Sequence, residues 1–392
     1  MLNKDLNKNM IPLSVPHISG NEWKYIKECL DTEWVSSVGK YVDKFESAIC
    51  SWSGAKYAVA CVNGTAALHI ALKLVGVTPG DEVIVPTVTF ISPVNAVRYL
   101  GAEPVFMDCD KYYNMDVEKL IEFIKKETFF KKGQTINKTT NNKITAVIPV
   151  HIFGNAVNLD RLLPVCKERN IKIVEDAAES MGTCYREEAL NGRCTGTIGD
   201  IGCYSFNGNK IITTGGGGMI VSDSQKYAEK ARYVTTQAKD DSLHSIHNEI
   251  GYNFRLTNIQ AAMGVAQLEN LKKYLKIKKC NYDYYKAEID EILGLHLAEV
   301  PDYADNNYWM YALQIDKEVY GKSREELMLF LQKNNIQTRP IWHLNHLQLP
   351  YKDCQNYKIE KAYDMLDKTL NIPCSVNLKK ESIDQVIRNL KC

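Results

Sequence analysis

The sequence predicts an α/β protein built on a large, mostly parallel sheet, with a smaller α+β unit towards the C-terminus. Short apolar runs alternate with helical patterns over the first 230 residues, and these runs are rich in β-branched side chains. Such alternation places helices on both faces of a parallel sheet. Because these sheets bind ligands at the carboxyl ends of their strands, we expect the chemistry in the loops that directly follow the apolar runs.

Four apolar runs predict buried strands, and helical patterns separate them. The runs cover residues 81–86, 104–108, 144–150 and 171–175. The helical patterns cover residues 66–74, 92–100 and 159–169. Residues 131–143 are polar and almost free of large apolar side chains, which predicts an exposed insertion before the next strand.

The rest of the chain predicts a second unit. Apolar side chains at helical spacing over residues 254–275 indicate one long connecting helix. Residues 309–315 and 336–342 predict strands, and residues 323–334 predict a helix that a capping box of Ser323 and Glu326 begins. We therefore expect a large ligand-binding domain with an N-terminal arm at 1–255. The connecting helix and the smaller C-terminal domain are expected at 256–392.

Composition and charge exclude several classes of protein. The 392 residues carry 48 basic and 47 acidic side chains, without the basic excess that holds a protein to nucleic acid. No apolar run is long enough to span a membrane, and the N-terminus lacks the apolar core of a signal peptide. The 12 cysteines show no zinc-binding spacing. We expect no metal, a reducing cytoplasmic location, and cysteines that mostly fill the core.

Two strand ends carry polar groups suited to a cofactor. Gly64 and Thr65 open a helix whose free N–H groups and hydroxyl would hold a phosphate, although an ordinary helix start has the same pattern. Glu175 and Asp176 end another apolar run, where carboxylates are costly unless they are paired. Asp176 would pair with a protonated ring nitrogen or cap a helix, and its spacing leaves both interpretations open.

A lysine follows the next strand. Lys210 lies between apolar runs and close to four glycines at 215–218, which would let the backbone approach a ligand closely. A lone lysine is usually exposed, whereas a partly desolvated one can form a Schiff base. The glycine spacing fits neither a dinucleotide-binding fingerprint nor a P-loop. Asn253 would reach a phosphate or a neighbouring subunit, although its spacing alone favours a helix-capping segment.

Taken together, these segments supply a phosphate cradle, a carboxylate for a pyridinium nitrogen and an amine for an aldehyde. These are the three handles that pyridoxal phosphate offers a protein. Their order along the chain also matches the large domain of the type I, aspartate-aminotransferase fold.

Over nearly its whole length the sequence resembles the DegT/DnrJ/EryC1/StrS sugar aminotransferases. The strongest pieces are NGTAALHIAL, EDAAESMG, GDIGCYSFNGNKIITTGGGGMI and GYNFRLTNIQAA. Within that family the chain looks closest to the LegC-like enzymes. The resemblance implies a pyridoxal phosphate-dependent transaminase that transfers the amino group of L-glutamate to the C4 ketone of UDP-2-acetamido-2,6-dideoxy-hexos-4-ulose. Its product would enter surface glycans of the legionaminic acid or bacillosamine type.

The resemblance also implies roles for single residues. Lys210 would bind the cofactor and shuttle a proton, and Asp176 would keep the pyridine nitrogen protonated. Gly64, Thr65 and Ser205 would bind the phosphate. The other implied cofactor contacts are Phe90 stacked on the ring, Glu179 near the ring oxygen, and Asn253 reaching the phosphate from the neighbouring subunit of a homodimer. The implied contacts with the sugar nucleotide are Trp34, Ser36, Asn209, Arg339 and His343.

Three departures from the family pattern leave the groups that would bind the cofactor unchanged. Many members have His at Asn207, Gln at Glu179, and Gly-Glu-Gly-Gly at 215–218. One alternative is an aminotransferase for GDP-4-keto-6-deoxymannose, of the perosamine type; another is a catalytically silent regulator, which would be expected to lose a handle. A dehydratase of the same fold would carry His in place of Lys210.

Overall fold

The structure is a computed structural model and describes residues 10–241 and 243–392. A ten-stranded sheet runs through it in the order β1-β10-β9-β7-β6-β2-β3-β15, with β4 and β5 beside β6. The strands are β1 (Tyr57–Cys61), β2 (Glu82–Pro86), β3 (Glu103–Met107), β4 (Thr128–Lys131), β5 (Gln134–Asn137), β6 (Lys143–Val147), β7 (Lys172–Asp176), β9 (Ile201–Ser205), β10 (Gly218–Ser222) and β15 (Asn356–Tyr357).

Pairing between neighbouring strands confirms the mostly parallel sheet. From β9 through β7, β6, β2 and β3 to β15 every pair is parallel. Only β10, with its neighbours β1 and β9, and the β4–β5–β6 pairings are antiparallel. The carboxyl ends of β1, β2, β7 and β9 therefore meet at one edge.

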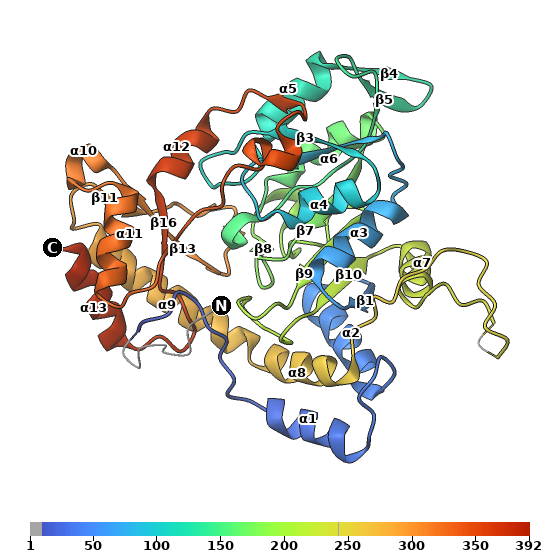
Figure 1. The fold of residues 1–392 in the computed structure, drawn as a ribbon, viewed down its shortest axis with the longest axis horizontal. Coiled ribbons are helices and arrows are strands. Elements are labelled where there is room, and N and C mark those ends of the chain that lie inside the picture. Colours follow the sequence, from blue (N-terminus) through green and yellow to red (C-terminus); the bar gives the residue numbers. More distant parts are fainter. Residues whose placement is uncertain (1–9, 242) are drawn as a thin grey trace.

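Helices cover both faces of this sheet, as the alternating apolar pattern predicts (Figure 1). On β2, Val83 and Val85 pack with helices α3 and α4 on one face, while Ile84 packs with α5 and α6 on the other. The helices of this part are α1 (Glu22–Asp31), α2 (Lys40–Ser53), α3 (Gly64–Leu74), α4 (Ser92–Tyr99), α5 (Val117–Lys126), α6 (Leu159–Glu168), α7 (Gln225–Thr235) and α8 (Asn258–Glu269).

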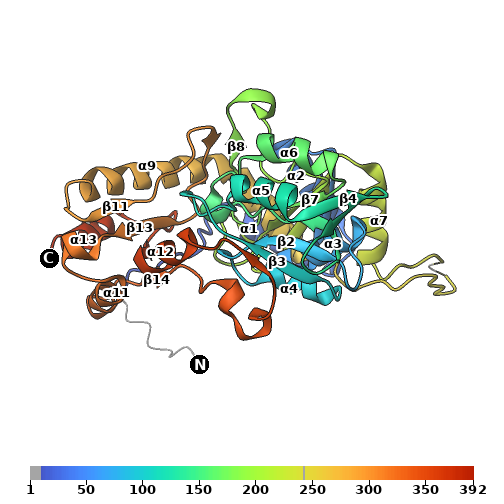
Figure 2. The same cartoon turned by 90° about the horizontal axis from the view of Figure 1, so that it is seen from above.

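The C-terminal part folds around an antiparallel sheet of order β11-β13-β16-β14 with its own apolar core, seen beside the large sheet in Figure 2. The N-terminal arm joins it, because the Ile11 N–H donates to the Asn335 carbonyl at 2.8 Å. The Ser323–Glu326 capping box is confirmed at the start of α11. The remaining elements are α9 (Leu271–Ile289), α10 (Lys317–Tyr320), α11 (Arg324–Lys333), α12 (Lys361–Lys368), α13 (Lys380–Leu390), β8 (Cys184–Tyr185), β11 (Leu295–Leu297), β12 (Ala304–Asp305), β13 (Tyr311–Ile315), β14 (Arg339–Pro340) and β16 (Thr369–Ile372).

One element prediction is confirmed in part and one is wrong. Residues 131–143 are mostly exposed and precede β6, as predicted, but they are not without structure, because β4 and β5 form a hairpin that pairs with β6. Its polar Asn137 is buried because the side-chain amide donates to the Glu82 carboxylate at 2.7 Å, so its polarity did not mean exposure. The single helix predicted over 254–275 is two helices, which meet at Asn270.

The cysteines follow the prediction in part. Six of the ten free cysteines are buried, as expected of small core residues. Cys184 and Cys194, however, form a disulfide, which a reducing compartment does not lead one to expect. The β8 hairpin brings them opposite each other, and their separation of 10 residues in the sequence gave no such signal. No helix in the described residues is long and apolar enough to cross a membrane.

Candidate active site

A cavity of about 360 Å³ lies at the edge where the carboxyl ends of β1, β2, β7 and β9 meet. The cavity thus lies in the loops after these strands, where the parallel sheet leads us to expect a ligand. The side chains that argue for a site are Asn63 and Thr65 after β1, Thr89, Phe90 and Ser92 after β2, Asp176 and Glu179 at the end of β7, and Ser205, Asn207, Asn209 and Lys210 after β9. Trp309 and Trp342 complete the wall from the C-terminal part.

One end of the cavity is lined by hydroxyl groups and the start of α3. Thr65 and Ser92 are hydrogen-bonded through their hydroxyls at 2.8 Å, and Ser205 faces the same end. A Cβ on Gly64 would lie 3.0 Å from the Ser205 Cβ, so glycine allows the close approach of these two segments. Asn63 caps α3, accepting the Ala66 N–H at 2.8 Å. The segment is therefore both an ordinary helix start and a place suited to an anion, because the N-terminus of α3 and three hydroxyls converge there.

Asp176 lies at the end of β7, inside the cavity wall. It is 4% exposed, and one carboxylate oxygen accepts the Ala178 N–H at 3.0 Å. A turn and not a helix follows it, so the alternative interpretation as a helix cap is wrong. Burial raises the pKa of Asp176, and within the described ranges no cationic side chain lies at ion-pair distance from it. A ligand with a protonated ring nitrogen would supply the missing counter-charge.

Glu175, its neighbour, is not part of the cavity. It is fully buried and accepts from His151 Nε2 at 3.0 Å and from the backbone N–H groups of Gly196, Ile198 and Gly199. Burial alone would raise the pKa of Glu175, but His151 and these N–H groups outweigh it and hold that pKa below its usual value. Glu175 therefore fixes the segment that precedes β9 and leaves Asp176 to meet a ligand.

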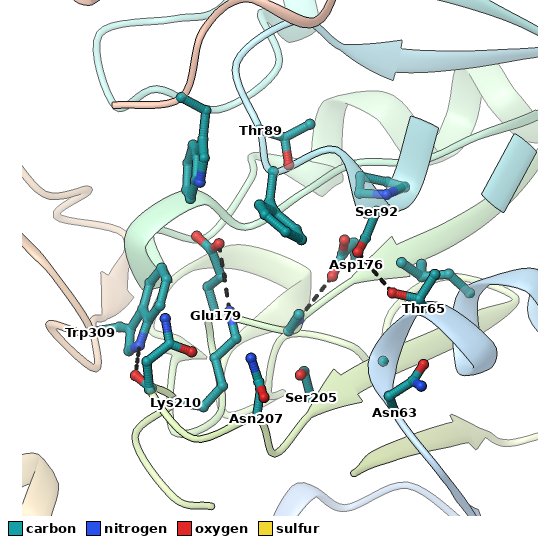
Figure 3. A pocket seen from close by; sticks show the side chains of 17 residues that line it. Asn63, Thr65, Thr89, Ser92, Asp176, Glu179, Ser205, Asn207, Lys210 and Trp309 are labelled. Carbon is teal, nitrogen blue, oxygen red and sulfur yellow. Dashed lines mark hydrogen bonds and ion pairs between the residues drawn. The ribbon is translucent and has the colours of Figure 1, made fainter. Parts of the chain in front are cut away.

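Lys210 and Glu179 face each other in the middle of the cavity (Figure 3). Lys210 Nζ lies 3.7 Å from Glu179 Oε1, and the lysine side chain is 13% exposed. The other carboxylate oxygen of Glu179 accepts the Phe153 N–H at 2.9 Å. Lys210 Nζ also lies 4.0 Å from the centre of the Trp309 ring. The amine is thus held in a partly desolvated position, as the prediction of a reactive lysine requires.

The four glycines at 215–218 lie outside the lining of the cavity in a single chain. A Cβ on Gly218 would lie 2.4 Å from the Asn63 carbonyl oxygen, so the run lets β10 pack against the turn that precedes α3. The close approach that the structure shows is to the backbone of the turn before α3, and an approach to a ligand stays a prediction.

The structure brings together eight of the thirteen predicted site residues. Those that line the cavity are Gly64, Thr65, Phe90, Asp176, Glu179, Ser205, Asn209 and Lys210. Those that do not line it in a single chain are Trp34, Ser36, Asn253, Arg339 and His343. Trp34, at 58% exposure, and Asn253 both lie on the surface. Their roles stay predictions, because each would have to act from another copy of the chain or after a movement.

Two large aromatic residues of the wall could not be assigned to it from the sequence. Trp309 and Trp342 both lie in segments that predicted ordinary strands of the C-terminal unit. Only tertiary packing carries them to the loops after β7 and β9. Thr89 and Ser92 could have been assigned to the site more easily, because they follow a predicted strand and the site was expected in such loops.

Replacing Glu179 with glutamine is expected to change how stability depends on pH. Burial raises the pKa of Glu179 to about 7 in the folded protein, from an ordinary value of 4.5. Because the folded state then binds this proton more tightly than the unfolded state, its contribution to stability falls as the pH rises from about 4.5 to about 7. Denaturation of cofactor-free protein between about pH 5 and about pH 8 should show a smaller decline for Glu179→Gln than for the wild type. Parallel curves would show that the carboxyl does not titrate in this range.

Comparison with known proteins supports the same class of site. The pattern of the DegT/DnrJ/EryC1/StrS aminotransferase family matches residues 16–391. A GDP-perosamine synthase of Caulobacter vibrioides is 36% identical over 385 residues, which are 97% of each chain. A GDP-perosamine synthase of Vibrio cholerae is 34% identical over 385 residues, covering 97% of this chain and 98% of the relative. A solved DegT DnrJ EryC1 StrS aminotransferase from Brucella abortus superposes with a TM-score of 0.83 at 25% identity, covering 95% of this chain and 94% of that one.

Proposed function

Because the chain belongs to the DegT/DnrJ/EryC1/StrS aminotransferase family, whose members depend on pyridoxal phosphate, we propose that it aminates the C4 ketone of a nucleotide-linked keto-deoxy sugar with L-glutamate as donor. One observation carries the proposal. A single cavity holds the Lys210 amine, the buried Asp176 carboxylate and the hydroxyl groups at the start of α3. No other class of ligand weighed from the sequence calls for all three.

The residues of the cavity fit the cofactor. Thr65 and Ser205 would hold the phosphate with the N-terminus of α3, and Asp176 would meet the pyridine nitrogen. Phe90, 53% exposed on the cavity wall, has a free ring face on which the pyridine would stack. When bound, the cofactor supplies an electron sink that makes the carbon beside the reacting nitrogen acidic.

The protein's own groups then move one proton in each half-reaction. Lys210 Nζ would take the proton from the donor carbon of glutamate and later deliver one to C4 of the sugar. Glu179, 3.7 Å from that amine, would keep it directed into the cavity. The Asp176 carboxylate would hold the proton on the ring nitrogen throughout. Binding of the nucleotide would orient the ketone against Lys210, which sets the new stereocentre.

The active unit is proposed to be a homodimer with shared sites. Asn253 is exposed and lies outside the cavity of its own chain, in a surface hollow with Arg232 and Arg255. These two arginines bind the buried Glu46 carboxylate at 2.7 and 2.6 Å. A fixed cationic hollow that presents Asn253 suits the phosphate of a cofactor bound by a second copy. Trp34, Ser36, Arg339 and His343 would join the sugar-nucleotide site in the same assembly.

The comparisons weigh towards the alternative sugar. The motif resemblance favours a UDP-linked 2-acetamido sugar of the legionaminic acid type. The relatives from Caulobacter vibrioides and Vibrio cholerae are named GDP-perosamine synthases, and each covers almost the whole chain. We therefore place GDP-4-keto-6-deoxymannose first and the UDP-linked sugar second. The cytoplasmic location stays a prediction.

A panel of keto sugars tests the choice of substrate. Purified enzyme with glutamate is expected to form 2-oxoglutarate with the GDP-linked 4-keto sugar at a kcat/KM at least about ten-fold above that with the UDP-linked sugar. The reason is that nucleotide binding orients the ketone, so the wrong base loses transition-state contacts. Turnover of the UDP-linked sugar alone would restore the LegC-like assignment. Turnover of neither would contradict a 4-keto sugar substrate.

A further inference from the structure

Lys278, in α9, is a buried lysine that the proposed reaction does not use. It is 3% exposed, and its Nζ donates to the backbone carbonyls of Trp309, at 2.9 Å, and Cys374. Burial lowers the pKa of this amine, and within the described residues no carboxylate pairs with it. Burying an amine without a carboxylate is costly, whereas methionine would fill the same space without that cost. A lysine is therefore best explained here by what it holds.

The carbonyl that Lys278 holds belongs to a residue in contact with the reactive amine. The Trp309 indole lies against Lys210, whose Nζ is 4.0 Å from the ring centre. The indole Nε1–H donates to the Asn209 carbonyl at 2.8 Å, which fixes the rotation of the ring beside the lysine loop (Figure 3). An ammonium over an indole face is attracted by the ring quadrupole. Trp309 therefore has both the contact and the fixed orientation needed to direct Lys210.

Asn307 binds the same segment to the other functional loop. It is fully buried, and its Nδ2 donates to the backbone carbonyls of Glu179, at 2.8 Å, and Met181, at 3.0 Å. Its Oδ1 accepts the Trp309 N–H at 2.9 Å. Residues 307–309 thus contact the loop of Glu179 and the loop of Lys210 at once, while α9 holds them from behind through Lys278.

We propose that Lys278 and Asn307 are positioning residues that hold Trp309 against Lys210, and that the Trp309 indole directs the Lys210 amine. The inference rests on the proton-transfer role proposed for Lys210. An amine that moves a proton in two half-reactions must return to one place in each of them. The ring supplies that place whenever the amine is free and charged. A displacement of about 1 Å costs up to about 100-fold in rate, so the support behind the ring matters.

A double-mutant cycle in the full-length enzyme tests the link. Lys278→Met keeps the length and apolar volume of the side chain but removes its N–H donors. We expect it to lower kcat about 10- to 100-fold, with KM for glutamate changed less than about two-fold. Trp309→Leu should have a similar effect, and Lys278→Met should add less than about two-fold in the Trp309→Leu background. The control is Lys276→Met. Lys276 is an exposed lysine two residues before Lys278 on the same helix, and its replacement should leave kcat unchanged.

A second readout does not depend on activity. In cofactor-free protein, Lys278→Met should alter the tryptophan emission spectrum, and the difference should vanish in the Trp309→Leu background. The proposal would be overturned if Lys278→Met lowered kcat by the same factor with and without Trp309. It would also be overturned if Lys278→Met kept the wild-type kcat. Should Lys278→Met fail to fold, Trp309→Phe keeps an aromatic face beside Lys210 but loses the Nε1–H bond to the Asn209 carbonyl. It is expected to lose less of kcat than Trp309→Leu does; equal losses in the two variants would overturn the proposal.

These outcomes remain separate from a failure of the proposed function. If Lys210 does not carry the cofactor, borohydride will not fix it there in the wild-type enzyme, whatever Lys278 does. If Lys210 carries the cofactor and the cycle is additive, only the positioning by Lys278 and Trp309 is wrong.

Discussion

Replacing Lys210 with alanine is expected to lower the rate of 2-oxoglutarate formation about 10³- to 10⁴-fold. The reason is geometric. Lys210 Nζ is the only side-chain amine among the described residues that line the cavity, and it lies 3.7 Å from Glu179. Without it no other amine of the described lining is in place to take the proton from glutamate or to return one to the sugar. The measurement is single-turnover formation of 2-oxoglutarate by purified, cofactor-loaded protein.

Lys276→Ala is the matched control, because it removes an exposed amine from the same chain. It should retain the wild-type rate. A Lys210→Ala enzyme with more than about one tenth of the wild-type rate would show that another base moves the proton.

Asp176→Asn is expected to lower the same rate about 10²- to 10³-fold while leaving the fold intact or more stable. The neutral amide cannot hold a proton on the ring nitrogen by charge, so the electron sink weakens. In the cofactor-free protein the same substitution is expected to leave stability unchanged or to raise it. Burial raises the pKa of Asp176, so its ionised form is unfavourable in the folded state. Its removal should therefore not lower the free energy of unfolding at about pH 8.

Two measurements check these expectations. The rate of the cofactor-loaded enzyme should fall, and the free energy of unfolding of the cofactor-free form, from chemical denaturation, should not. Asp283→Asn, on the exposed side of α9, serves as the control for a general effect of removing a carboxylate. A large loss of stability together with the loss of rate would show that Asp176 is a structural residue. An unchanged rate would remove it from the site.

The fold and the centre of the site could be predicted from the sequence for a physical reason. Parallel strands that helices cover on both faces must be apolar throughout, so β2, β3, β6 and β7 are visible as runs. The groups that a strand end presents come directly after such a run. Gly64, Asp176 and Lys210 could therefore be located. The parallel pairing of β7 and β9 brings Asp176 and Lys210 to one edge, and β1 ends at the same edge because it pairs antiparallel with β10, which pairs antiparallel with β9.

What could not be predicted depends on packing between distant segments. Trp309 belongs to a strand pattern of the second unit, and nothing in its neighbourhood indicates that Lys278 binds its carbonyl while its indole lies against Lys210. The polarity of Asn137 suggested exposure, but a buried partner, Glu82, satisfies it. The glycines at 215–218 indicated close approach correctly but not to what, since the neighbour at 2.4 Å is the Asn63 backbone. The roles of residues that would act across a dimer cannot be read from the structure of a single chain.

The central claim is that Lys210 carries the cofactor of a sugar aminotransferase, and one measurement tests it most directly. Cofactor-loaded wild-type protein is reduced with borohydride, digested, and mapped by mass spectrometry. We expect one modified peptide, with the cofactor mass on Lys210, and its loss after treatment with glutamate before reduction. The cofactor fixed on another lysine, such as Lys278, or an adduct at Lys210 that glutamate does not remove, would contradict it.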